Sequence, residues 1–221
     1  MTGTLRTFIA LMAMLAAGQA AAWPAVPLPA QSQGEWVTRH MNYNGLNMRA
    51  SRFVTTQGME DVKRFYQGLW GREHVQNNIS DKTVLGRAEG TYFITVELKT
   101  LGGGTEGMIG VLEMVDDELD FTMGEGFVTP GGSEVYNDIR YFDGPRPVRV
   151  LGLHNGHSPF VNHQFFHRQL RMQGWRILSD PNACGSFANA CVVSFERQDQ
   201  TMTLVISRDG QESSQVVATI E

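Results

Sequence analysis

The predicted fold is decided by the stretch Met59-Glu-Asp-Val-Lys-Arg-Phe-Tyr-Gln-Gly-Leu-Trp70, in which apolar residues recur with a period of about 3.6 residues. This period is typical of a helix with one apolar face. The stretch Pro159-Phe-Val-Asn-His-Gln-Phe-Phe-His-Arg-Gln-Leu170 lies 100 positions later (59 to 159) and has an aromatic pair in the same place. Ser158 is suited to cap this second helix, and Gly174 is suited to end it. We therefore predict two equivalent helices. The apolar face of the first is expected to hold Val62, Phe65, Tyr66, Leu69 and Trp70.

The similarity between the two stretches extends to their neighbours. Met48–Val54 parallels Val148–His154 at the same offset of 100 (48 to 148), and Thr91–Leu98 parallels Thr201–Arg208 at an offset of 110 (91 to 201). Few residues are identical, but the pairings keep a fixed order, and the extra residues lie mostly in one cysteine-bearing loop. We interpret this pattern as an internal duplication.

Short segments bounded by glycine and aspartate predict strands around each helix. After the first helix they cover 83–86, 91–98 and 108–114, and in the second copy they cover 191–195, 201–207 and 215–220. Each copy is thus a strand, a helix and an antiparallel meander. The predicted fold class is α+β, a tandem duplication of a small unit in which one helix packs on an antiparallel sheet. A unit of about 70 residues has a small core, so we expect the two copies to pack together.

The amino terminus has the pattern of a secretory signal. Arg6 precedes an apolar run from Phe8 to Ala17, and small residues follow as far as Ala22. The run is shorter than the roughly 20 apolar residues that span a bilayer. We expect cleavage after Ala22 and a periplasmic or secreted product with no stable transmembrane segment. The alternative is an uncleaved membrane anchor or a buried helix.

The predicted organisation has five segments. They are a signal peptide (1–22), a proline-rich tether (23–34), a first α+β repeat (35–115), a link with room for a hairpin around Gly131-Gly132 (116–144) and a second α+β repeat with a disulfide loop (145–221). Prolines at the density seen in 23–34 favour an extended chain.

The sequence contains only two cysteines, Cys184 and Cys191. In an exported protein two cysteines so close together most simply form a disulfide. The chain-entropy model assigns about 2.5 kcal/mol to closing a loop of this length. Zinc sites use shorter ligand spacings than this pair, so a metal site at the cysteines is disfavoured.

Four of the six histidines lie close together: His154, His157, His163 and His167. Imidazole is a good ligand for zinc and copper, and His163 and His167 are one helical turn apart. Against a metal site, the matching residues of the first copy are Lys63 and Gln67 on its polar flank. That match predicts that both helical histidines point toward solvent. Both alternatives stay open, and no cofactor is firmly expected.

Composition and motifs exclude several functions. The net charge is −5 and there is no basic stripe, so the chain lacks the footprint of a nucleic-acid-binding protein. Neither a phosphate-binding loop nor a G-x-S-x-G elbow is present, and no catalytic residues are predicted. We expect a non-enzymatic protein-binding or assembly module of a cell-envelope or secretion machine, with a protein partner in the envelope. The alternative is a periplasmic metal- or small-ligand-binding protein that uses the four histidines.

Overall fold

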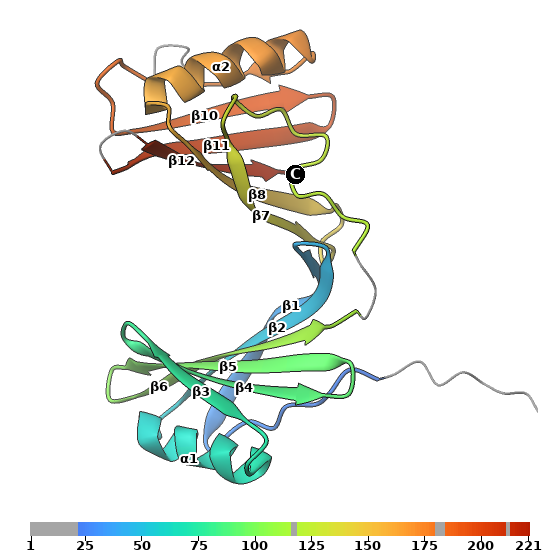
Figure 1. The fold of residues 1–221 in the computed structure, drawn as a ribbon, viewed down its shortest axis with the longest axis vertical. Coiled ribbons are helices and arrows are strands. Elements are labelled where there is room, and N and C mark those ends of the chain that lie inside the picture. Colours follow the sequence, from blue (N-terminus) through green and yellow to red (C-terminus); the bar gives the residue numbers. More distant parts are fainter. Residues whose placement is uncertain (1–21, 116–118, 180–183, 211–212) are drawn as a thin grey trace, which may run out of the picture.

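The structure of the protein is a computed structural model that describes residues 22–115, 119–179, 184–210 and 213–221. Nearly all of the predicted signal peptide lies outside these residues. The described residues form two helices and twelve strands, and the strands make one antiparallel sheet (Figure 1). Neither helix is long and apolar enough to cross a membrane, so the described part of the chain contains no candidate spanning helix.

The sheet has two halves of six strands each. The first half contains β1 (Ser32–Tyr43), β2 (Leu46–Thr55), α1 (Met59–Trp70), β3 (Val75–Ile79), β4 (Lys82–Glu89), β5 (Tyr92–Leu101) and β6 (Gly104–Glu113). The second half contains β7 (Glu134–Tyr141), β8 (Val148–Asn155), α2 (Pro159–Met172), β9 (Arg176–Ile177), β10 (Ala190–Arg197), β11 (Gln200–Asp209) and β12 (Ser213–Ile220). The strand order is β3-β4-β5-β6-β2-β1-β7-β8-β12-β11-β10-β9. Counted outward from the β1–β7 junction, the two halves therefore have the same order of strands.

Both helices begin where the sequence predicts. The side chain of Ser158 accepts a hydrogen bond from the backbone nitrogen of Val161 at 3.3 Å, and α2 is followed by Gly174 with a positive φ of 84°. In α1 the buried residues are Val62, Tyr66 and Trp70. Leu69, which was expected on the apolar face, is 44% exposed, so the buried stripe is narrower than predicted.

Each helix packs on its own half of the sheet and forms a separate core. Tyr66 and Phe166 occupy matching places on the two helices, and neither side chain is exposed. Burial of an apolar side chain of this size contributes about 1.5–3 kcal/mol, so each core stabilises its own half. The first core also contains Phe53, Leu85, Ile94, Val96, Leu98, Ile109 and Val111, and the second contains Leu151, Leu153, Leu170, Val193, Phe195, Leu204 and Ile206.

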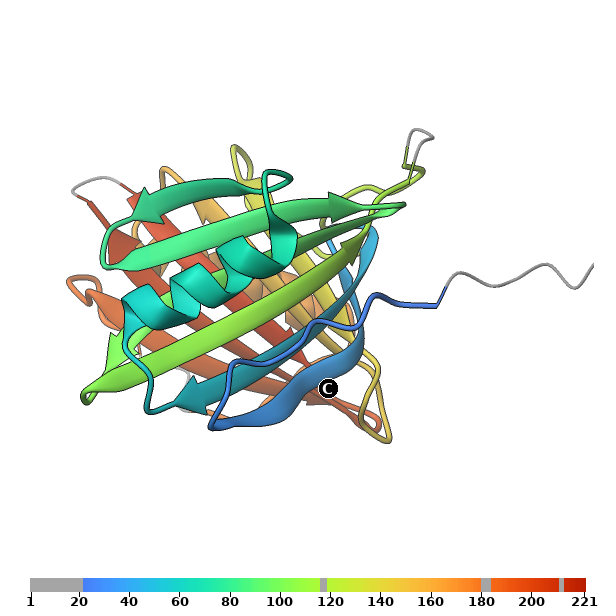
Figure 2. The same ribbon diagram turned by 90° about the horizontal axis from the view of Figure 1, so that it is seen from below.

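The sheet is bent into a C with one helix on the outside of each arm of the C (Figure 1). We call the helix-bearing side the outer face and the opposite side the inner face. The view from below shows α1 lying across the outer face of the first half (Figure 2). The two halves are joined where β1 pairs with β7 through Met41↔Tyr141, Asn42↔Arg140 and Tyr43↔Ile139. This junction is the waist of the C.

A non-regular segment precedes each half and packs on its outer face. Residues 22–31, which we call the first arm, include most of the expected tether (23–34), but Trp23 and Val26 pack against the first core. The hydroxyl of Tyr66 donates to the carbonyl oxygen of Pro27 at 3.1 Å. Residues 119–133, the second arm, bring Phe127 against Phe166 with ring centroids 5.8 Å apart. The proline-rich segment is thus extended but held down, and its last residues belong to β1.

β1 and β3 were not predicted, and β7 lies in the link (116–144), for which only a possible hairpin around Gly131-Gly132 was expected. The pairing of β1 with β2 has register shifts between Trp36 and Met41, and a shift also interrupts the pairing of β7 with β8. Bulges break the period of two that identifies a strand in sequence. All five residues of β3 are exposed, and the three between Val75 and Ile79 are amides, so the strand lacks a clear alternation of apolar and polar residues.

Candidate functional site

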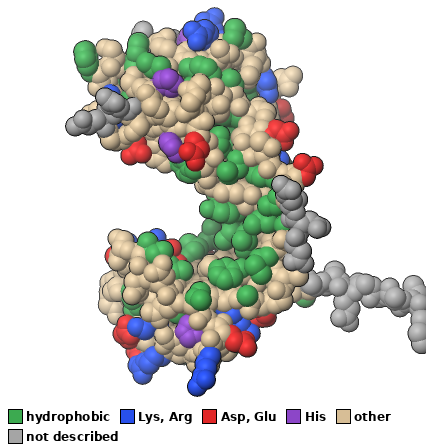
Figure 3. Space-filling model, in the orientation of Figure 1, with side chains coloured by type: hydrophobic (Ala, Val, Ile, Leu, Met, Phe, Trp, Pro, Cys, Tyr) green, Lys and Arg blue, Asp and Glu red, His purple; other side chains and the backbone are tan. Residues whose placement is uncertain are grey.

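A cavity of about 370 Å³ lies on the inner face at the waist. We call it the waist pocket. Side chains from five strands of both halves line it, and hydrophobic side chains fill the floor of the C in the space-filling view (Figure 3). The lining residues are Met41 and Tyr43 of β1, Met48 of β2, Phe93 and Thr95 of β5, Gly110 and Leu112 of β6 and Ile139 of β7.

Strand alternation explains why apolar side chains point into this pocket. Ile94 and Val111 belong to the outer core, so their neighbours Phe93 and Leu112 face the inner side. Near the waist these strands are therefore apolar on both faces. Such a pattern is typical of a sheet that is covered on both sides, and here the inner cover is absent from the described residues.

Two glycines shape the floor of the waist pocket. A Cβ atom on Gly86 would lie 2.9 Å from Cζ of Phe93, so the aromatic ring rests against the backbone there. A Cβ atom on Gly110 would lie 2.7 Å from Cε of Met48 and 2.8 Å from Oγ1 of Thr95. The missing side chains leave room for the pocket.

The waist pocket is electrically neutral. Its polar groups are the hydroxyls of Tyr43 and Thr95, and the Thr95 hydroxyl donates to the carbonyl oxygen of Gly110 at 3.5 Å. Charges further along the inner face of the first half occur in pairs. Nζ of Lys82 lies 2.6 Å from Oε1 of Glu97, and Nζ of Lys99 lies 2.9 Å from Oδ2 of Asp81. The guanidinium group of Arg52 forms ion pairs with both Glu35 and Glu106. The pocket therefore suits an uncharged, apolar group.

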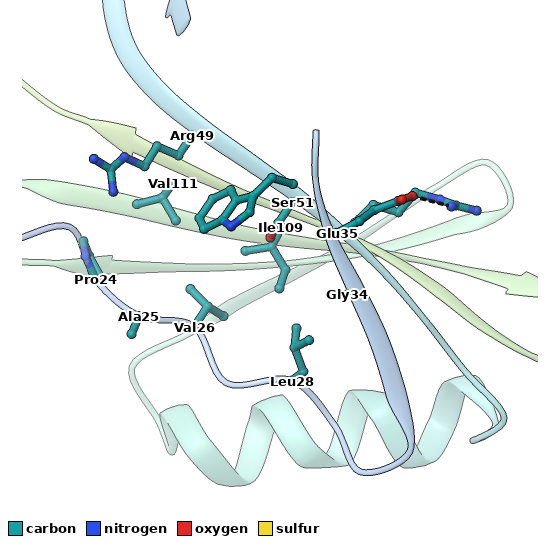
Figure 4. A pocket seen from close by; sticks show the side chains of 12 residues that line it. Pro24, Ala25, Val26, Leu28, Gly34, Glu35, Arg49, Ser51, Ile109 and Val111 are labelled. Carbon is teal, nitrogen blue, oxygen red and sulfur yellow. Dashed lines mark hydrogen bonds and ion pairs between the residues drawn. The ribbon is translucent and has the colours of Figure 1, made fainter. Parts of the chain in front are cut away.

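A second cavity, of about 340 Å³, lies on the outer face under the first arm. Figure 4 shows Val26 and Leu28 of the arm facing Ile109 and Val111 of the sheet across this space. A cavity of about 340 Å³ also lies beside the second arm and includes Arg149, which matches Arg49 of the first cavity. Because such a cavity recurs in both halves, we attribute it to the packing of an arm on the sheet. The waist pocket, in contrast, lies where the two halves meet.

The structure brings together two of the four predicted metal ligands. The ring centroids of His163 and His167 are 6.0 Å apart. His154 lies on β8 with Nε2 3.5 Å from a Glu134 oxygen, and Nε2 of His157 lies 2.9 Å from the carbonyl oxygen of Gly131. Among the described residues no group of three or more His, Cys, Asp or Glu side chains is placed to hold a metal ion.

His163 corrects the prediction that both helical histidines point toward solvent. Its side chain is buried, with 1% exposure, and neither ring nitrogen has a hydrogen-bond partner. α2 lies on the sheet along Asn162, Phe166 and Leu170, and His163 falls inside this stripe. Burial, with a smaller contribution from nearby His167, lowers the pKa of His163 below its usual value.

The disulfide prediction is confirmed. Cys184 and Cys191 are bonded, their Cα atoms are 5.3 Å apart, and both are buried in the second core. The loop that they close carries Phe187 at its exposed end, with 94% of its surface accessible. The bond therefore anchors this loop to the core of the second half.

The chain matches no family model, no curated protein and no solved structure. The function must therefore be inferred from the geometry of the chain itself.

Sequence reasoning missed the waist pocket, because the pairing of β1 with β7 was not predicted and the pocket depends on it. One signal was available. Tyr92-Phe93-Ile94 and Val111-Leu112 are consecutive apolar residues within strands, which indicates that both faces of those strands are covered or occupied.

Proposed function

We propose that this protein is an exported, non-enzymatic binding module of the cell envelope or of a secretion machine. In this proposal the inner face of the C holds an apolar segment of a protein partner. The waist pocket carries the proposal, because it is apolar and neutral and lies where the first half meets Ile139 of the second. Burial of an apolar side chain from a partner in such a pocket is the usual way in which a few residues supply most of the binding energy.

The shape of the inner face favours a protein partner over a small molecule. Pockets for small molecules enclose most of the ligand surface, whereas apolar residues here continue beyond the pocket along the sheet. Val192 and Val205 lie on adjacent strands of the second half, are 54% and 42% exposed, and alternate with core residues. Met41 and Met48 add flexible side chains that adapt to a partner.

Export is supported by the buried disulfide between Cys184 and Cys191, because such bonds persist outside the reducing cytoplasm. The amino-terminal signal pattern of residues 1–22 is consistent with the same compartment. Amino-terminal sequencing of the exported protein is expected to begin at Trp23. A product that begins at Met1 would contradict export by a cleaved signal.

The proposed function is tested by placing a charge in the waist pocket. Leu112→Glu buries an unpaired carboxylate against any apolar partner group, so we expect recovery of the partner by in-cell crosslinking to fall at least about tenfold. Val161→Glu is the matched control, because Val161 is 47% exposed on the outer surface of α2. Circular dichroism checks that both variants fold. Equal recovery with Leu112→Glu and the wild type would contradict the proposal.

We also propose that the two halves arose by tandem duplication. The shared strand order supports this, and so does one matching hydrogen bond. The hydroxyl of Thr105 donates to the carbonyl oxygen of Gln57 at 2.8 Å, and the hydroxyl of Ser214 donates to that of His157 at 2.6 Å. In each half the hydroxyl comes from the last strand and fixes the turn before the helix. Sequences of relatives with intermediate similarity between the halves would test this origin.

The metal-binding alternative has one supporting observation, the proximity of His163 and His167. Zinc titration by calorimetry, with His167→Ala compared with His154→Ala, separates the alternatives. A site at α2 predicts that the first substitution removes binding and the second leaves it unchanged. Binding no tighter than the micromolar range in the wild type would end the metal hypothesis.

A further inference from the structure

The two outer edges of the sheet are protected to different degrees. β9 is two residues long, and Arg176 on it forms an ion pair with Glu196. β3 is five residues long, and its sequence Val-Gln-Asn-Asn-Ile contains no charge and no proline. All five residues are exposed, with Val75 at 66% and Ile79 at 56%. Natural sheets usually shield an edge by charge, proline, a bulge or short length, and β3 has none of the first three.

The pairing of β3 with β4 fixes which backbone groups face outward. The hairpin closes at the pair Ile79↔Lys82, with two residues between them. Hydrogen-bonded and non-hydrogen-bonded pairs alternate along an antiparallel ladder, so Val75, Asn77 and Ile79 direct their backbone groups toward β4. The backbone N–H and C=O groups of Gln76 and Asn78 are therefore directed outward, away from the sheet.

The sequence of β3 is complementary to itself in the antiparallel direction. When two copies meet about a two-fold axis at Asn77, Val75 lies opposite Ile79 of the second copy and Gln76 lies opposite Asn78. Val75 and Ile79 then face each other on one side of the sheet, with the two Asn77 amides paired between them, and Gln76 and Asn78 face each other on the other side. The outward N–H and C=O groups of Gln76 meet those of Asn78 in the second copy, which completes the hydrogen-bonded pairs.

We propose that β3 is a self-association edge, through which two copies of this chain join their sheets by antiparallel pairing centred on Asn77. The contact is isologous, as the commonest protein dimers are. It places both inner faces on the same side of a continuous sheet. Two waist pockets presented together would bind a repetitive partner with greater avidity than one. The self-association itself does not depend on the function of the waist pocket.

Cysteine crosslinking tests the register directly. Asn77 of the two copies would form a non-hydrogen-bonded pair, whose Cα atoms lie about 4.5 Å apart, within the range of a disulfide. The native cysteines are already paired with each other. We expect Asn77→Cys to form a covalent dimer under mild oxidation. Gln76→Cys is the matched control, because its two copies would lie more than about 7 Å apart on the diagonal, beyond disulfide reach. Equal dimer formation by both variants, or none by Asn77→Cys, would overturn the proposed register.

A proline substitution tests the edge without a new cysteine. Gln76→Pro removes an N–H group that faces outward and leaves the bonds between β3 and β4 in place. Gln76→Ala removes the same side chain but keeps the N–H group. In sedimentation equilibrium the wild type and Gln76→Ala should approach twice the mass of one chain as concentration rises, while Gln76→Pro should stay at the mass of one chain. A wild type that stays monomeric, as expected if only a foreign strand pairs there, or a Gln76→Pro variant that still associates, would overturn the proposal.

Discussion

The two halves of the sheet share a strand order but fasten their arms by different chemistry. In the first half the guanidinium carbon of Arg49 lies 4.4 Å from the ring centroid of Trp23 in the first arm. In the second half Arg149 forms an ion pair with Asp138 at 2.6 Å, and Asp138 also accepts from the backbone nitrogen of Gly124 in the second arm at 2.9 Å. Arg49 and Arg149 thus both help to hold an arm on the sheet. Arg49 does so by a cation–π contact, and Arg149 by a buried ion pair.

The helices differ in a similar way, because α2 buries more polar side chains than α1. Val62 of α1 corresponds to Asn162 of α2, which exchanges two side-chain hydrogen bonds with buried Asn155 at 2.9 and 3.0 Å. Lys63 corresponds to the buried His163. The second half therefore holds a disulfide, an ion pair, an amide pair and a titratable ring in or beside its core. Its stability should respond to pH and to reduction, whereas that of the first half should respond little.

Removal of the buried ion pair is expected to have the largest effect. Asp138 is fully buried and the side chain of Arg149 is 19% exposed, so Asp138→Ala leaves a charge with little access to water. We expect the free energy of unfolding of the second half to fall by about 3–5 kcal/mol in urea denaturation. Arg49→Ala, the matched change in the first half, should cost about 1 kcal/mol. Equal losses would show that the two arms are fastened with similar strength.

The same ion pair predicts an acid dependence. Although burial opposes it, the hydrogen bonds from Arg149 and Gly124 hold the pKa of Asp138 below its ordinary value. A carboxylate whose pKa is lower in the folded state stabilises the fold above its unfolded pKa of about 4, and this contribution is lost as the pH falls through the folded value. Asp138→Ala should therefore flatten the fall in stability below about pH 4.

Removal of the disulfide is expected to have the next largest effect. Cys184→Ala with Cys191→Ala should lower the unfolding free energy of the second half by about 2.5 kcal/mol, because the unfolded chain regains the freedom of the closed loop. Fluorescence of Trp175, in the second core, reports this half. The remaining tryptophans, Trp23, Trp36 and Trp70, precede the junction and report the first. A simultaneous and equal shift of both signals would mean that the halves unfold as one unit.

Protonation of His163 is expected to have a smaller effect near neutral pH. Below about pH 6.5 a histidine of the unfolded chain binds a proton, while the buried ring, whose pKa is lowered, stays neutral. The unfolded state then binds more protons than the folded state. The free energy of unfolding is therefore unaffected by this group above about pH 6.5, and it falls by up to about 1.4 kcal/mol per pH unit below that pH. His163→Leu should remove this slope in urea denaturation at pH 7.5, 6.5 and 5.5. A slope that persists in the variant would assign it to another group.

The smallest expected effect is that of Tyr66→Phe, at one of the two matching aromatic places on the helices. Tyr66→Phe makes the first half resemble the second, where Phe166 stands, and removes the hydrogen bond to Pro27. The expected loss is about 1 kcal/mol of unfolding free energy. Phe166→Tyr, the reverse change, should cost more if its hydroxyl finds no partner, about 1–3 kcal/mol. A neutral Phe166→Tyr variant would show that the second arm offers an acceptor.

Much of each half of the sheet could be predicted from local sequence signals. The helix period of 59–70, the Ser158 cap and the strands after each helix depend on neighbouring residues, and the structure contains these elements. The close cysteine pair was also sufficient to predict its disulfide. These features are encoded within short stretches of chain, so one sequence is enough to find them.

Features that depend on distant pairing were not predicted. β1 and β7 contain bulges and mixed residues, and their pairing across the junction involves residues 41–43 and 139–141. The waist pocket exists only because of that pairing. The burial of His163 was missed for a related reason, because the rotation of α2 about its axis is set by packing against β9, β10 and β11.

The most direct test of the inner face as the binding surface is site-specific photocrosslinking in intact cells. A photoreactive residue at Met48, in the waist pocket, or at Val205, on the inner face of the second half, should give an adduct with the same partner. The same residue at Gln164, exposed on α2, should give none. Adducts from Gln164 but not from Met48 would place the partner on the outer face and contradict the account.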